Sequence, residues 1–215
     1  MLSARDVAGH PDGEEAAIAS VRANGLRVTG FQVLRDFEGL SGNLHDYKVD
    51  IAKSMLEMAH ALGANRLLAC SSTSAHARGD TAALVADLRK LATLGVPMNV
   101  RIAYEAFSWG RHVNEYAQSW DIVARADHAN LGLGLDSFHL LAAKSSLAAL
   151  PDIDREKIFL VQFSDFMWHE TKSIEERIET ALHFRVFPGE GAHSAEVAAM
   201  LGERVDRLRE RAGAH

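Results

Sequence analysis

Short apolar runs alternate with amphipathic stretches along most of the chain, and each run has a length typical of a buried strand. Five runs are predicted as strands: Arg27–Leu34, Arg66–Cys70, Met98–Glu105, Leu131–Asp136 and Lys157–Phe163. The stretches between and after them repeat apolar residues at a helical period near 3.6. Five helices are predicted: Asp46–Leu62, Asp80–Leu94, Asn114–Ala129, Ser173–His183 and Ser194–Ala212. This β-α-β-α order indicates an α/β domain with a parallel sheet.

Three consecutive predicted strands end in a polar oxygen: Glu105, Asp136 and Gln162. The carboxyl ends of the strands in a parallel barrel all face one side, so these three side chains are expected to converge. Five strands would suffice for a doubly wound sheet, but a ligand site there gathers at the switch point rather than at three successive strand ends. We therefore predict an incomplete TIM-type barrel of five to six parallel strands with outer helices, in one domain over residues 1–215.

Two carboxylates and an amide oxygen are ligands that suit a hard divalent cation. Mg²⁺ or Mn²⁺ is expected ahead of Zn²⁺, with Co²⁺ as an alternative. Each of these three residues could instead have a purely structural role. Glu105 could form a buried ion pair, Asp136 could cap the following turn, and Gln162 could bond to backbone groups.

Composition narrows the function classes further. The 215 residues carry a net charge of −6 with both signs interspersed, so no basic surface for nucleic acid or an anionic membrane is expected. The single cysteine, Cys70, indicates a reducing compartment. No apolar run has the length of a membrane span, and the start of the chain lacks a secretory h-region. A cytoplasmic protein that acts on a small molecule is expected.

Several segments, taken in order, resemble the 3-dehydroshikimate dehydratases of the xylose isomerase-like, endonuclease IV-like barrel superfamily. The resemblance covers roughly Leu26 to Gly191. Its motifs are F-Q-V-L-R-D-F-E-G (Phe31–Gly39), L-L-A-C-S (Leu67–Ser71), R-I-A-Y-E-A-F-S-W-G-R-H-V-N (Arg101–Asn114), A-D-H-A-N-L-G-L-G-L-D-S-F-H (Ala126–His139), K-I-F-L-V-Q (Lys157–Gln162) and H-F-R-V-F-P-G-E-G (His183–Gly191). Together these motifs are specific, whereas any one alone would be weak.

The resemblance implies roles for particular residues. Glu105, Asp136 and Gln162 would hold the metal, and His139 would be the acid/base. Arg35 and Arg185 would hold an anionic substrate, a task suited to the planar guanidinium fork. His112 is a further candidate for a substrate contact.

The chain also departs from the family pattern. The first two strands and the eighth strand of the barrel are expected to be missing, which would leave two open sheet edges. The eighth strand carries the family's fourth metal ligand, and Glu190 is the one nearby acid that could replace it. Ala181 stands where the family has a serine that contacts substrate.

The function that the resemblance implies is metal-dependent dehydration of 3-dehydroshikimate to protocatechuate. Two alternatives stay open: a sugar isomerase or epimerase of the same superfamily, and a truncated relative without catalytic activity. Because open strand edges associate unless they are covered, we also expect a homo-oligomer. A second copy could then supply a carboxylate to the metal.

Overall fold

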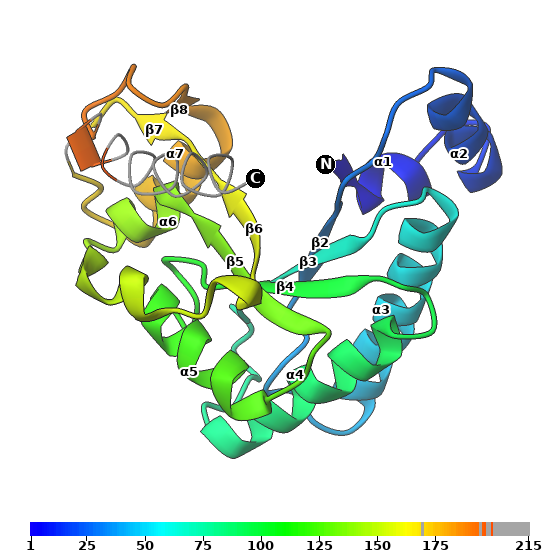
Figure 1. Ribbon diagram of the computed structural model, residues 1–215, viewed down its shortest axis with the longest axis horizontal. Helices are drawn as coiled ribbons and strands as arrows, with labels where there is room; N and C mark the ends of the chain where they lie inside the picture. Colours follow the sequence, from blue (N-terminus) through cyan, green and yellow to red (C-terminus); the bar gives the residue numbers. More distant parts are fainter. Residues whose placement is uncertain (169, 194, 197–198, 200–215) are drawn as a thin grey trace, which may run out of the picture.

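The computed structural model describes residues 1–168, 170–193, 195–196 and 199. Its main sheet has six parallel strands in the order β1-β2-β3-β4-β5-β6. Their bounds are β1 Leu2–Ser3, β2 Phe31–Arg35, β3 Arg66–Cys70, β4 Arg101–Glu105, β5 Leu131–Asp136 and β6 Ile158–Gln162. Figure 1 shows the sheet as an open arc, with α3, α4 and α5 along its outer side. The predicted incomplete barrel is confirmed.

Seven α-helices lie within the described residues: α1 Ala4–Ala8, α2 Glu14–Ala23, α3 Asn43–Ala61, α4 Thr81–Gly95, α5 Tyr116–Ala126, α6 Ser137–Ala142 and α7 Ile174–His183. Two 3-10 helices, Leu147–Asp152 and Arg155–Lys157, precede β6. The prediction that the helix over Asn114–Ala129 begins at Asn114 is wrong. Helix α5 begins at Tyr116, and its N-cap is Glu115, which forms a capping box with Gln118. The predicted helix Ser194–Ala212 falls mostly outside the described residues.

Two strands match their predicted bounds, and the other three are shorter than predicted. The first predicted strand, β2, begins at Phe31 instead of Arg27. The third predicted strand, β4, begins at Arg101 instead of Met98, because a turn with a positive φ at Asn99 precedes it. The expectation that both opening strands are missing is also wrong in part. Leu2–Ser3 pairs in parallel with β2 as a short strand, and its two residues are too few to give a periodic signal.

The two faces of the sheet are packed differently. Leu131, Leu133 and Leu135 alternate along β5 and join the large core between the sheet and the outer helices. The glycines between them face the inside of the arc. A Cβ atom at Gly132 would lie 2.7 Å from the Phe159 ring, and one at Gly134 would lie 3.2 Å from the Cβ of Glu105. The L-G-L-G-L-D pattern therefore clears space beside the strand ends.

A separate antiparallel pair, β7 Asp165–Phe166 and β8 Arg185–Val186, follows β6 and brackets α7. Neither strand was predicted, since each has two residues. Arg185, the first residue of β8, hydrogen-bonds to Asp136 at the carboxyl end of β5. Among the described helices, none combines the length and the apolar character needed to cross a membrane.

Candidate metal centre and active site

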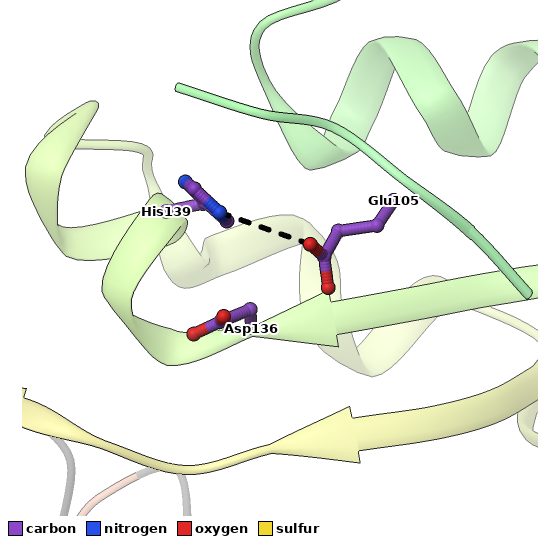
Figure 2. Close-up of side chains that lie close together, drawn as sticks. All are labelled: Glu105, Asp136 and His139. Carbon is purple, nitrogen blue, oxygen red and sulfur yellow. Dashed lines mark ion pairs between the residues drawn. The ribbon is translucent and has the colours of Figure 1, made fainter. Parts of the chain in front are cut away.

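Three side chains converge where β4 and β5 end. Glu105 ends β4, Asp136 ends β5, and His139 lies on the first turn of α6 directly after β5. One potential ligand atom from each lies within 4.8 Å of the others, and all three residues are buried (Figure 2). Gln162 ends β6 directly opposite Asp136 in the sheet register. The strand ends therefore bring the predicted ligands to one edge of the sheet.

The two oxygens of Glu105 have different surroundings. Oε1 accepts a hydrogen bond from the Cys70 thiol at 3.6 Å and lies 3.7 Å from Nε2 of His139. Oε2 is buried and has no hydrogen-bond partner in the part of the chain that the structure describes. Burial, together with the nearby negative charge of Asp136, raises the pKa of Glu105 to about 8, although Arg185 opposes the shift. A nearby cation would reverse this preference for the protonated form.

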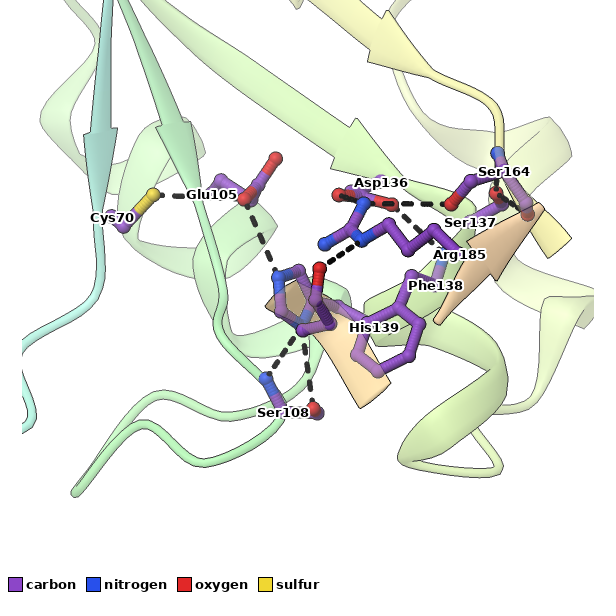
Figure 3. Close-up of polar contacts among 10 residues, drawn as sticks. Cys70, Glu105, Ser108, Asp136, Ser137, Phe138, His139, Ser164 and Arg185 are labelled. Atoms are coloured by element: carbon purple, nitrogen blue, oxygen red, sulfur yellow. Dashed lines mark hydrogen bonds and ion pairs between the residues drawn. The ribbon is translucent and has the colours of Figure 1, made fainter. Parts of the chain in front are cut away.

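Asp136 has partners for both oxygens. Oδ1 accepts from the backbone N–H of Phe138 at 2.9 Å, which caps α6, and Oδ2 accepts from Nη1 of Arg185 at 2.5 Å. Nε of Arg185 donates to the carbonyl of Ala181, and its guanidinium lies 4.6 Å from the Phe138 ring centre. Arg185, predicted as a substrate contact, therefore contacts the ligand cluster itself (Figure 3).

His139 is held from one side by Ser108, in the loop after β4. The Ser108 backbone N–H donates to Nδ1 at 3.3 Å, and the Ser108 hydroxyl lies at the same distance from Nδ1. The N–H suits an unprotonated Nδ1, and the hydroxyl oxygen can accept from a protonated one. Ser108 thus supports both tautomers while Nε2 faces Glu105. Burial lowers the pKa of His139 to about 4, with a smaller opposing effect from Asp136.

The donor set fits a hard cation. Oε2 of Glu105 and Oε1 of Gln162 are both buried acceptors without a hydrogen-bond partner among the described residues. An unpaired buried acceptor costs free energy, on the order of 1–3 kcal/mol each, unless another group satisfies it. A divalent cation bound by oxygen ligands would satisfy both atoms at once. Glu105, Asp136 and Gln162 are therefore suited to hold such an ion.

Arg35, at the end of β2, is exposed and lies opposite Cys70 in the sheet register. Its guanidinium carbon is 5.6 Å from the ring centre of Phe107, and within the described chain no hydrogen bond or ion pair reaches the guanidinium group. The acids beside it in sequence, Asp36 and Glu38, bond elsewhere. Among the described residues, Arg35 therefore forms no ion pair with either acid.

His112 and Glu190 lie outside the cluster. Nε2 of His112 lies 2.9 Å from the carbonyl oxygen of Ala77, in the loop before α4. The role of His112 as a substrate contact stays a prediction. Glu190 is an exposed turn residue whose backbone N–H bonds to Phe187. Glu190 is not part of the metal-ligand cluster that the described residues form.

The sequence reasoning overlooked the loop that follows β4. Its segment A-F-S-W-G supplies Ser108 and two rings close to His139: Phe107 at 5.1 Å and Trp109 at 4.9 Å between ring centres. It also overlooked Cys70 as a partner of Glu105. A usable signal was present, because this loop starts immediately after a predicted ligand and loops at that edge carry function.

The arc of parallel strands defines an incomplete TIM-type barrel, and the polar cluster at the carboxyl ends of its strands is a possible metal site. A profile of the xylose isomerase-like TIM barrel family matches residues 5–205, and the chain belongs to that family. A curated 3-dehydroshikimate dehydratase of Pseudomonas aeruginosa is 40% identical over 183 residues, which is 85% of this chain. The chain spans only 28% of the length of that relative.

Two solved structures resemble the chain closely. A xylose isomerase-like TIM barrel/4-hydroxyphenylpyruvate dioxygenase fusion protein is 38% identical, with a TM-score of 0.79 over 88% of this chain and 30% of its own. The IolI protein, solved with a zinc atom, has a TM-score of 0.76 over 92% of this chain and 71% of its own. At 23% identity, IolI is evidence of the shared fold alone.

Proposed function

We propose that the protein catalyses the metal-dependent dehydration of 3-dehydroshikimate to protocatechuate. The observation that carries the proposal is the pair of unpartnered oxygens, Glu105 Oε2 and Gln162 Oε1, at the strand ends that also present His139 and Asp136. The curated relative that is 40% identical supports the choice of substrate. IolI, which shares the fold, was solved with a bound zinc atom.

Glu105, Asp136 and Gln162 would hold the ion, with Mg²⁺ or Mn²⁺ preferred and Co²⁺ also acceptable. When bound, the ion would polarise the substrate ketone and its neighbouring hydroxyl and so acidify the α-hydrogen. Glu105 and Asp136 are buried, and the exclusion of water around them strengthens the electrostatic interactions at the site.

His139 would exchange the protons through Nε2. With its Nδ1 proton bonded to the Ser108 hydroxyl, Nε2 has a free lone pair and can accept the α-hydrogen as a proton. The β-hydroxyl then leaves with the proton returned from Nε2, so that one water is lost. The resulting dienone becomes aromatic when a ring C–H proton moves to the ketone oxygen. Because burial lowers the pKa of His139, its imidazole is neutral at neutral pH.

The substrate carries a carboxylate, and Arg35 is a cation without a described polar partner at the same edge of the sheet. Arg185 would be a second cation near the site, where it bonds to Asp136. A neutral sugar offers no charge to match Arg35. This favours the dehydratase over the alternative sugar isomerase or epimerase.

The test is an assay of protocatechuate formation from 3-dehydroshikimate with Mg²⁺, Mn²⁺ or Co²⁺, and again after chelation. We expect turnover that chelation abolishes and added metal restores. Turnover of a neutral ketose, with 3-dehydroshikimate inert, would favour the isomerase. Inertness toward both, in metal-loaded protein, would favour the relative without catalytic activity.

We also propose that the protein self-associates through its sheet. β1 and β6 each have one neighbouring strand in the described sheet, and open strand edges tend to pair. A second copy could bring a carboxylate to the ion. Size-exclusion chromatography with light scattering should give a dimer at micromolar concentration, and a stable monomer would contradict the proposal.

A further inference from the structure

A strip of rings connects Arg35 with His139. The Arg35 guanidinium lies over Phe107, and Phe107 is stacked on Trp109 with 4.9 Å between ring centres and 24° between planes. Trp109 in turn meets His139 edge-on at 4.9 Å and 71°. The strip thus runs from a cation without a polar partner to the group that would exchange protons.

Hydrogen bonds to the loop that carries Phe107 and Trp109 hold the strip in place. The backbone N–H of Phe107 donates to the Ser71 hydroxyl at 2.9 Å, and the N–H of Gly110 donates to the Phe107 carbonyl at 2.8 Å. Nη1 of Arg177 donates to the Ser108 carbonyl at 2.9 Å. A side chain at Gly110 would overlap backbone and side-chain oxygens. The rings are therefore preorganised rather than free to rearrange.

Phe107 and Trp109 differ in how far their rings are exposed to solvent. Phe107 is 7% exposed, whereas Trp109 is partly exposed and packs against apolar residues on both sides of the site. Aromatic faces interact best with flat partners, and a cation held over a ring is positioned for an anion. A ligand that reaches both Arg35 and His139 would lie across Phe107 and Trp109.

We propose that Phe107 and Trp109 form the aromatic wall of the substrate pocket and select a flat ring that carries a carboxylate. The inference rests on the proposed function and extends it to specificity. The six-membered ring of 3-dehydroshikimate flattens as it becomes aromatic, so stacking on the wall grows along the reaction. Phe107 also holds Arg35 in position for the carboxylate.

Two ligands that differ chiefly in ring planarity test the wall. Benzoate and cyclohexanecarboxylate carry the same carboxylate and have no hydroxyl group to chelate the metal, but only the first has a flat ring. Calorimetry on the Mn²⁺-loaded protein should give about tenfold tighter binding of the flat ligand. Trp109→Leu should remove most of that preference, and Trp109→Phe should keep most of it. Trp168→Phe, at an exposed tryptophan beside Phe184, should behave as the unchanged protein does.

The outcomes test the proposed aromatic wall and the proposed reaction independently of each other. If 3-dehydroshikimate is turned over but Trp109→Leu keeps the full preference, the wall is wrong and the reaction stands. If the preference depends on Trp109 but no protocatechuate is formed, the wall stands and the reaction is wrong. Equal binding of both ligands by the unchanged protein overturns the wall. Phe107→Leu, which should weaken carboxylate binding severalfold, gives a second variant if Trp109→Leu misfolds.

Discussion

Two groups of acidic side chains lie at the same edge of the same sheet and differ in what surrounds them. Asp36 and Glu38 follow β2, whereas Glu105 and Asp136 end β4 and β5. Oδ1 of Asp36 accepts hydrogen bonds from backbone and hydroxyl groups of the loop after β3, and Oε1 of Glu38 accepts from a backbone N–H of that loop. Within the described residues, the one hydrogen bond that Glu105 accepts is a weak bond from the Cys70 thiol.

The different surroundings indicate a structural role for Asp36 and Glu38 and a binding role for Glu105 and Asp136. Asp36 and Glu38 fasten the loop after β2 to the loop after β3, since one oxygen of each accepts from backbone N–H groups of the loop after β3. Glu105 faces a second acid, and its unpartnered oxygen is matched by one on Gln162. Repulsion between Glu105 and Asp136 is costly without a cation, whereas the β2 acids need none. Glu105, neither of whose oxygens has a backbone donor among the described residues, therefore indicates a metal site more strongly than Glu38 does.

The largest effect is expected at His139. His139→Ala should lower the rate of protocatechuate formation by about 10²–10⁴-fold, because it removes the group that exchanges protons. Mn²⁺ affinity should change little, whereas the temperature of thermal unfolding should fall somewhat, because His139 is buried against three rings. His76→Ala, at an exposed histidine in the loop after β3, is the matched control. A His139→Ala protein that keeps most of its activity would reassign the acid/base role.

A smaller effect is expected at Ser108. Ser108→Ala removes the hydroxyl that can accept from Nδ1 of His139 but keeps the backbone N–H. The rate should fall about tenfold, the cost of roughly one hydrogen bond, with KM nearly unchanged. Nitrogen NMR of His139 should show a larger share of the tautomer protonated on Nε2. Ser108→Thr should restore both properties, and an unchanged tautomer ratio in Ser108→Ala would contradict this role.

The centre of the fold could be predicted from sequence more closely than its edges. Arg66–Cys70 and Leu131–Asp136 match their predicted bounds because long apolar runs with sharp ends leave few alternatives. The two-residue strands β1, β7 and β8 have no period to detect. They form because strands distant in the sequence, or the turn around α7, supply their hydrogen bonds. Pairing of this kind depends on tertiary context.

The same contrast holds for the site. The positions of Glu105, Asp136 and Gln162 at one edge follow from strand order, so sequence patterns could predict them. The ion pair of Arg185 with Asp136 depends on how α7 folds back, and the ring contacts of Trp109 depend on the shape of one loop. Neither contact leaves a sequence signal of its own.

Glu38 should show its structural role through the pH dependence of stability. Burial raises the pKa of Glu38, although bonds from Ser72 and Tyr104 oppose the shift. Above the ordinary pKa of a glutamate, the folded protein then binds more protons at this site than the unfolded chain does. The contribution of Glu38 to the free energy of unfolding therefore falls as pH rises through that window.

Glu38→Gln cannot titrate, yet its amide oxygen can still accept both hydrogen bonds. The free energy of unfolding of this variant, relative to the unchanged protein, should rise from about pH 5 to about pH 8. Urea unfolding at the two pH values measures the difference. A constant difference would mean that Glu38 titrates alike in the folded and unfolded states.

The comparison between the two acidic groups is tested most directly by Mn²⁺ binding to a matched pair of variants, Glu105→Gln and Glu38→Gln. Both replace a buried glutamate with its amide, and both glutamates have one unpartnered oxygen. Equilibrium titration of Mn²⁺ should give one site in the unchanged protein and in Glu38→Gln. In Glu105→Gln the affinity should fall by about 100-fold or more, because the charge that balances the cation is lost. Equal Mn²⁺ affinity in the two variants would contradict the proposed metal site.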